Sequence, residues 1–122
     1  MIDFLEEVYK RKDKMIEDIQ TLCKIPSILD ETTANEGQPF GKACRDALDA
    51  MLEIGERDGF VCENVDGYAG HIDIGEGEET FGILGHLDVV PCNESGWNSE
   101  PYAATLKNGK LYGRGVADDK GP

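Results

Sequence analysis

Basic residues are scarce in this sequence: 12 lysines and arginines stand against 25 aspartates and glutamates, for a formal net charge of −13. Binding to nucleic acid or to an anionic membrane needs a basic face, so we expect neither as a partner. The acidity could favour cations, although a solvated surface explains it equally well.

Long apolar runs are also missing, since no segment approaches the roughly 20 apolar residues that span a bilayer. Residues 1–7 lack the basic and apolar regions of a signal peptide. The four cysteines, at positions 23, 44, 62 and 92, form no C-x-x-C pair. These absences predict reduced thiols and a cytoplasmic protein. No general base is evident beside Cys92, which argues against a nucleophilic role for that thiol.

The chain of 122 residues has room for one domain with a modest core. We find no internal repeat, low-complexity tract or interdomain linker. The whole of 1–122 is therefore treated as one unit, too short for the two-domain architecture of many hydrolases.

Two amphipathic helices are predicted in the N-terminal half. Asp3 followed by Glu6 fits a capping box that opens a helix running to about Cys23. Leu5, Val8, Met15, Ile19 and Leu22 recur at mostly three- and four-residue steps and predict one buried stripe on it. A polar surface loop (27–38) and a second helix over 39–57 should follow.

Short strands and tight turns are predicted next. Strands over 60–65 and 68–74 flank Asp66-Gly67, and a later hairpin over 105–112 centres on Asn108-Gly109; both dipeptides favour two-residue hairpin turns. His71 shares a strand face with Asp73, opposite the expected core face of Ile72 and Ile74. We therefore place His71 on the solvent side and do not count it as a ligand.

The segment 80–91 is the centre of the predicted fold. It begins as an apolar run typical of a strand that is buried on both faces. His86 and Asp88 stand two residues apart, so an extended backbone projects both to one side. A metal-binding histidine usually needs a carboxylate to hold its ring. A core histidine beside an unrelated loop aspartate is the alternative.

A second group of carboxylates lies close to the end of the sequence. Gly113 and Gly115 let the backbone turn sharply toward Asp118 and Asp119. An imidazole and three carboxylates suit zinc, and also manganese or cobalt, and a carboxylate can bridge two ions. The residues themselves indicate half of a metal-hydrolase site, because two metals need more ligands.

The ordered motifs resemble a known family. G-H-L-D-V-V-P, a tryptophan-containing loop ending in Pro-Tyr, and N-G-K-L-Y-G-R-G-V-A-D-D-K-G-P are similar to the co-catalytic zinc peptidases that include aminoacylase, carnosinase and dipeptidase V. The ending D-D-K-G-P looks most like the bacterial dipeptidase V (Xaa-His dipeptidase) branch, and Ile25-Pro26-Ser27 also fits.

The resemblance implies a role for each matching residue. His86 would be a terminal ligand of one metal ion, and Asp118 would bridge two zinc ions. Asp88 would act in catalysis by orienting His86 and tuning the site, while Asp119 would not bind metal. The 118–119 bond is a candidate for a cis peptide, and Arg114 would shape the turn that presents Asp118. The complete enzyme would hydrolyse dipeptides with a zinc-activated water.

The family's general-base glutamate, its remaining ligands and its lid domain all follow the last motif found here. The resemblance therefore makes 1–122 an N-terminal fragment of a metallopeptidase catalytic domain, expected to be inactive alone and to hold metal weakly or not at all. The expected fold is α/β, with two N-terminal helices packed on a mixed β-sheet of four or five strands. The open sheet edge predicts self-association.

Two other functions fit some of these features. H-x-D with a remote histidine is the facial triad of non-haem iron oxygenases, but that site needs a later histidine and an all-β fold. A binding or assembly module that retains a relic hydrolase fold is the non-enzymatic alternative, and metal content distinguishes it from a peptidase.

Overall fold

The structure, a computed structural model, describes the backbone of residues 1–122 and every side chain except that of Glu94. In chain order the elements are α1 (Phe4–Cys23), α2 (Lys42–Arg57), β1 (Val61–Val65), β2 (Ala69–Asp73), a 3-10 turn η1 (Glu94–Gly96), β3 (Thr105–Lys107) and β4 (Lys110–Tyr112). Among the described residues, no helix combines the length and apolarity that crossing a membrane requires.

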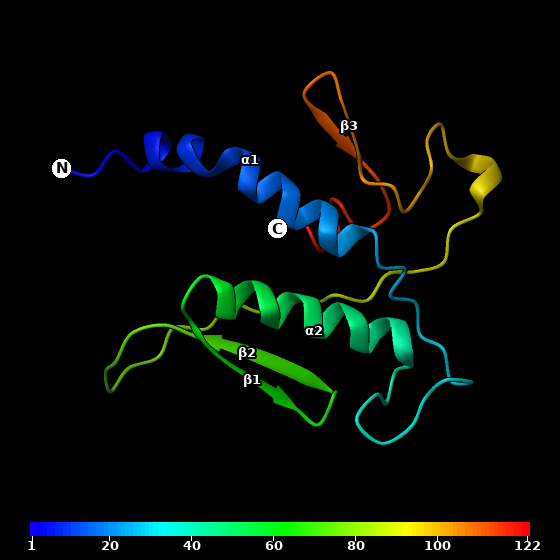
Figure 1. Cartoon of the computed structure of the whole chain (residues 1–122), viewed down its shortest axis with the longest axis horizontal. Helices are drawn as coiled ribbons and strands as arrows, with labels where there is room; N and C mark the ends of the chain where they lie inside the picture. Colours follow the sequence, from blue (N-terminus) through cyan, green and yellow to red (C-terminus); the bar gives the residue numbers. More distant parts are fainter.

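Helix α1 begins where the capping pattern predicted. The Asp3 carboxylate accepts hydrogen bonds from the backbone N–H groups of Leu5 and Glu6. Its predicted apolar stripe is only partly correct, because Leu22 is buried whereas Leu5 and Met15 are exposed. The reason is that other elements contact α1 mainly near its C-terminal half, so its first turns extend beyond the rest of the molecule (Figure 1).

Helix α2 forms the centre of a small layered unit with the β1–β2 hairpin (Figure 1). It begins at Lys42 rather than at residue 39. A side chain at Gly55 would lie 2.7 Å from Cys62 Sγ and 2.9 Å from Ile72 Cδ1, so the missing Cβ lets helix and hairpin approach closely.

The two hairpins follow their turn signals with one difference in register. Asn108 and Gly109 adopt φ of 53° and 72° in a two-residue turn, with Lys107 opposite Lys110. In the first hairpin Val65 is opposite Ala69, so the connection has three residues and includes Tyr68. His71 is on the solvent side as predicted, opposite Glu63, but Ile74 lies just beyond β2 and is exposed.

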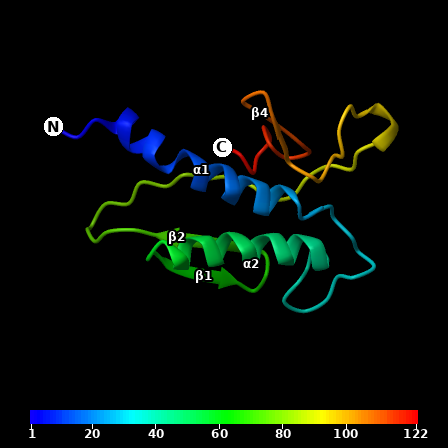
Figure 2. The ribbon, with the colours of Figure 1, turned by 45° about the horizontal axis from the view of Figure 1, so that its top comes forward.

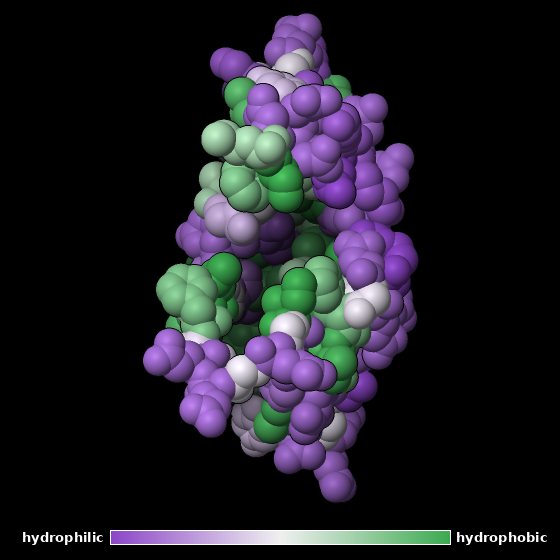
Figure 3. All heavy atoms as spheres, turned by 90° about the vertical axis from the view of Figure 1, so that its left-hand side faces the viewer, coloured by the Kyte–Doolittle hydropathy of each residue, from purple (hydrophilic) through white to green (hydrophobic). Residues whose placement is uncertain are grey.

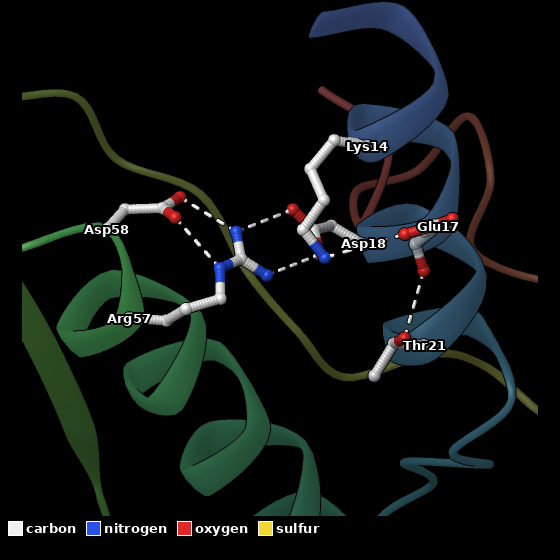
Figure 4. Close-up of polar contacts among 6 residues, drawn as sticks. All are labelled: Lys14, Glu17, Asp18, Thr21, Arg57 and Asp58. Carbon is white, nitrogen blue, oxygen red and sulfur yellow. Dashed lines mark hydrogen bonds and ion pairs between the residues drawn. The ribbon is translucent and has the colours of Figure 1, made fainter.

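Ion pairs join helices α1 and α2 (Figure 4). Arg57 at the end of α2 donates from Nη1 and Nη2 to the two carboxylate oxygens of Asp18 in α1, at 2.7 and 2.9 Å. It also contacts Asp58, while Lys14 contacts Asp18 from within α1. These contacts fix the two helices to each other at one end of α2.

The α/β class and the two N-terminal helices are confirmed, but the sheet differs from the prediction. Among the described residues, the four strands form two separate antiparallel hairpins and no mixed sheet. The expected central strand over 80–91 is neither helix nor strand in the described chain. Phe81, Ile83 and Leu84 are 90%, 90% and 99% exposed. A strand requires a hydrogen-bonded neighbour, and no described strand pairs with this segment.

Candidate functional site

The segment that carries His86 and Asp88 is fixed where it passes the end of α1. Ser27 donates from Oγ to the carbonyl of Leu87 at 2.6 Å, and its own carbonyl accepts from Val89 N at 2.9 Å. Ser27 is completely buried and Val89 nearly so. Residues 87–89 are therefore held in place, whereas residues 81–84 before them are exposed.

His86 and Asp118 meet, as the family resemblance implied. The Nε2 atom of His86 lies 3.0 Å from Asp118 Oδ1, although the residues are 32 positions apart. On the other side of the ring, Nδ1 lies 3.1 Å from the Asp88 carbonyl oxygen and 3.2 Å from its carboxylate Oδ1. The imidazole is thus held from both nitrogens, and one carboxylate faces each of them.

The turn that presents Asp118 is compact. Gly115 adopts φ of +86°, and the Lys120 backbone N–H donates to the Gly115 carbonyl at 2.9 Å. The Asp118–Asp119 peptide bond is cis, as the resemblance suggested. Asp119 points toward the other segment, where its Oδ2 accepts from the backbone N–H of His86 at 3.1 Å. The two segments are therefore joined by both aspartates.

Arg114 and Trp97 lie beside this turn. The Arg114 backbone N–H donates to the Pro101 carbonyl at 2.7 Å, and its guanidinium carbon lies 5.3 Å from the centre of the Trp97 ring. Arg114 thereby connects the tryptophan loop to the turn, which agrees with a structural role.

The site is open to solvent and electrostatically asymmetric. The side chains of His86, Asp88 and Asp118 are 50%, 68% and 87% exposed. The Asp118 carboxylate, through its contact with Nε2, raises the pKa of His86, and the nearby Asp88 carbonyl and charge act in the same direction. The arrangement therefore favours a positive charge between Nε2 and Oδ1. A proton on Nε2 supplies this charge when no other cation is bound.

Two residues to which the sequence analysis gave no role help to build the site. Ser27 holds the histidine segment, and Lys120 is buried with its ammonium 2.9 Å from the Leu22 carbonyl and 2.7 Å from the Ile25 carbonyl. Burial lowers the pKa of Lys120. The neighbours of Lys120 in the sequence are polar or glycine, a pattern that indicates an exposed lysine. Its burial therefore has no local signal in the sequence.

Other chemically active residues are not part of this arrangement. Cys92 Sγ lies 3.4 Å from Tyr102 Oη, and His71 contacts Glu63 and Asp73 on the β1–β2 hairpin. Two open cavities lie beside β1 and beside residues 35–39, and neither is lined by His86 or Asp118. Within the described side chains, no three or more His, Cys, Asp or Glu residues are grouped so that they could hold a metal ion.

Comparisons with known proteins agree with the motifs. Residues 82–122, which include both halves of the site, match the model of "Peptidase family M20/M25/M40". The chain is 48% identical over 116 residues to "Putative dipeptidase YtjP" of Bacillus subtilis (strain 168), covering 95% of this chain. It is 44% identical over 117 residues to a "Putative dipeptidase" of Staphylococcus epidermidis, covering 96%.

A third relative is the "Beta-Ala-Xaa dipeptidase" of Lactobacillus delbrueckii subsp. lactis, 42% identical over 122 residues and 99% of this chain. The chain spans about a quarter of the length of these curated relatives, 25% for the first two and 26% for the third. The resemblance that the ordered motifs indicated is thereby confirmed: residues 82–122 match peptidase family M20/M25/M40, and relatives named as dipeptidases match nearly the whole chain.

Proposed function

We propose that this chain is the N-terminal part of the catalytic domain of a zinc-dependent dipeptidase. His86 and Asp118 would be metal ligands, with Asp118 shared between two ions, and Asp88 would orient the imidazole. The observation that carries the proposal is the 3.0 Å approach of His86 Nε2 to Asp118 Oδ1. The dipeptidase names of the relatives, with the match of 82–122 to the peptidase family, support the reaction class.

The donor atoms fit one zinc ion. Two ligands that each lie about 2.0–2.1 Å from a tetrahedral zinc are about 3.3 Å apart, close to the separation found here. The Nδ1 atom faces the Asp88 carbonyl and carboxylate, which is the outer contact that a zinc-binding histidine needs. Manganese or cobalt could occupy the same donors.

Zinc bound here would supply a water of lowered pKa and would polarise the scissile carbonyl. Asp88 would keep the His86 ring in the tautomer that leaves Nε2 free to bind. Asp119 would hold the backbone of His86 against the turn of Asp118, through the 3.1 Å hydrogen bond already described.

The chain alone should bind metal weakly and should not hydrolyse dipeptides. Its described side chains group fewer than three ligands, and metal affinity falls steeply with ligand number. A cytoplasmic location is also proposed, supported by four cysteines that are all free thiols.

A chimera tests the proposal. The chain would replace the matching stretch of the Lactobacillus Beta-Ala-Xaa dipeptidase, to which it aligns over 99% of its length. The chimera should contain zinc and hydrolyse dipeptides, and its His86→Ala and Asp118→Ala variants should do neither. A folded chimera whose zinc content and activity survive both substitutions would refute the ligand assignment. A folded chimera without zinc would instead favour the relic binding module.

A further inference from the structure

The segment 22–27, from the last turn of α1 through Ser27, contacts both parts of the proposed site. One contact reaches the segment of His86, and the other reaches the turn of Asp118. Both parts lie far from this segment in the sequence. Leu87 is 60 positions after Ser27, and Lys120 is 95 positions after Ile25. A single short segment therefore holds two elements whose side chains meet 3.0 Å apart.

The contact of Ser27 fixes the histidine side. Leu87 stands between His86 and Asp88, and its carbonyl accepts from Ser27 Oγ at 2.6 Å. The Ser27 carbonyl accepts from Val89 N at 2.9 Å. Because Ser27 is fully buried, losing its hydroxyl would leave the Leu87 carbonyl without this partner.

The contact of Lys120 fixes the aspartate side. Its ammonium donates to the Leu22 and Ile25 carbonyls at 2.9 and 2.7 Å, at the end of a helix whose last turn has no basic residue before its C-cap, Lys24. A cation there adds a charged donor to two carbonyls that also accept from the backbone N–H groups of Ile25 and Ser27, and it interacts favourably with the helix dipole. The stem of Lys120 packs against Gly115, where a Cβ would be 3.2 Å from Lys120 Cδ.

We infer that Ser27 and Lys120 are positioning residues that together set the separation of His86 Nε2 and Asp118 Oδ1. The expected effect on metal binding rests on the proposed function. The positioning of the two side chains does not, because it is a property of the metal-free chain. The contact from Gln20 Nε2 to the Ala104 carbonyl, at 2.8 Å, provides a comparison, because it also joins α1 to a distant segment and contacts neither half of the site.

The test compares Ser27→Ala and Lys120→Met with the control Gln20→Ala. In the metal-free chain, the ring ¹⁵N resonances of His86 at fixed pH report its contact with Asp118, and Asp118→Asn defines the signal without that contact. Ser27→Ala and Lys120→Met should each move the His86 signal toward that of Asp118→Asn, and Gln20→Ala should leave it unchanged. In the chimera, the first two should weaken zinc binding by about 10-fold or more, as loss of outer contacts does in other zinc sites.

Milder variants keep the test decisive if the first ones do not fold. Ser27→Cys retains size with a weaker donor, and Lys120→Arg retains charge and donors. Intermediate His86 shifts in Ser27→Cys, and a signal near wild type in Lys120→Arg, are expected. The inference is overturned if all these variants match Gln20→Ala in the His86 signal. If the signal moves but the wild-type chimera holds no zinc, the positioning stands and the proposed metal role fails.

Discussion

His86 and Asp118 lie 3.0 Å apart, Nε2 to Oδ1, on two segments that share no hydrogen-bonded strand. Their contact depends on packing around the end of α1 and on the hydrogen bond from His86 N to Asp119. The contact also places a carboxylate acceptor beside an imidazole nitrogen. It should therefore affect the pKa of His86 and the pH dependence of the protein's stability.

Replacing Asp118 with Asn should lower the pKa of His86, because Asp118 is the main cause of its elevation. With the folded-state pKa above the unfolded value of about 6.5, protonated His86 stabilises the fold below about pH 6.5, and this contribution is lost as the pH rises through the folded pKa. NMR titration and urea unfolding at about pH 5.5 and about pH 8.5 measure both effects. Asp118→Asn should show a smaller loss of stability between the two pH values.

Asp88→Asn is the informative second variant, because it retains the backbone carbonyl that faces Nδ1. Its effect on the pKa of His86 should be smaller than that of Asp118→Asn. Equal pKa values for wild type and Asp118→Asn would mean that the 3.0 Å contact is absent in solution.

Local signals account for the parts of the fold that were predicted correctly. Asp3 caps α1 through its own side chain, and the Asn108-Gly109 turn has the positive φ angles that these residues tolerate. The segment 80–91 could not be predicted in the same way. Its composition indicates burial, but strand formation depends on a neighbouring strand, and no described strand pairs with it.

The candidate site likewise contains residues that the sequence predicted and residues that it did not. The H-x-D spacing and the adjacent aspartates were visible in the sequence, and the family resemblance connected them. Ser27 and Lys120 were not assigned a role, because a buried hydroxyl or ammonium is recognised only by its distant partners, the carbonyls of Leu87 and Ile25. The metal-binding roles of His86 and Asp118 stay predictions.

The ion pair between Arg57 and Asp18 should contribute modestly to stability. A double-mutant cycle with Asp18→Ala and Arg57→Ala should give a favourable coupling energy that exceeds that of an ordinary exposed pair, because the contact is bidentate. Arg57 lowers the pKa of Asp18, so this contribution is present above the unfolded Asp18 pKa and is lost as the pH falls through the folded value.

Lys42 and Asp46 provide the matched comparison, since they form an exposed ion pair within α2. Their cycle should give about 0.3–0.5 kcal/mol. Urea unfolding at low and high salt measures both cycles, and both couplings should shrink at high salt. A smaller coupling for the pair between helices than for the pair within α2 would contradict the role proposed for Arg57.

Gly67 should tolerate alanine far less well than Gly109. Both glycines have positive φ, 75° and 72°, so alanine strains the backbone similarly at the two turns. A Cβ at Gly67 would also lie 2.1 Å from the Gly37 carbonyl oxygen, whereas nothing lies within 4 Å of one at Gly109. Gly109→Ala should cost about 1 kcal/mol of unfolding free energy, and Gly67→Ala at least about 2 kcal/mol.

Urea unfolding midpoints of the two variants make this comparison directly. The difference between them isolates the contact of the β1–β2 connection with the loop at Gly37, because the strain from φ is common to both. Equal losses would show that the loop moves away from the hairpin without cost, and that the close approach is not needed for stability.

The exposed apolar segment formed by Phe81, Ile83 and Leu84 should cause self-association. These side chains are at least 90% exposed on a segment whose backbone groups have no strand partner. Apolar surface also gathers around a hollow on the face shown in Figure 3, and Figure 2 shows the segment as an extended stretch of chain that leaves β2. The net charge of −13 opposes association, so association should strengthen as salt screens the repulsion.

Sedimentation velocity over a range of protein and salt concentrations measures this association. The double variant Ile83→Lys/Leu84→Lys should sediment as a monomer under conditions in which the wild type associates, because charged side chains block pairing along an open edge. Ile74→Lys is the control, since Ile74 is also an exposed isoleucine, at 81%, outside the segment. If Ile74→Lys dissociates the protein as fully as the double variant, the added charge and not the segment is responsible. A wild type that stays monomeric at high salt would remove the basis for association altogether.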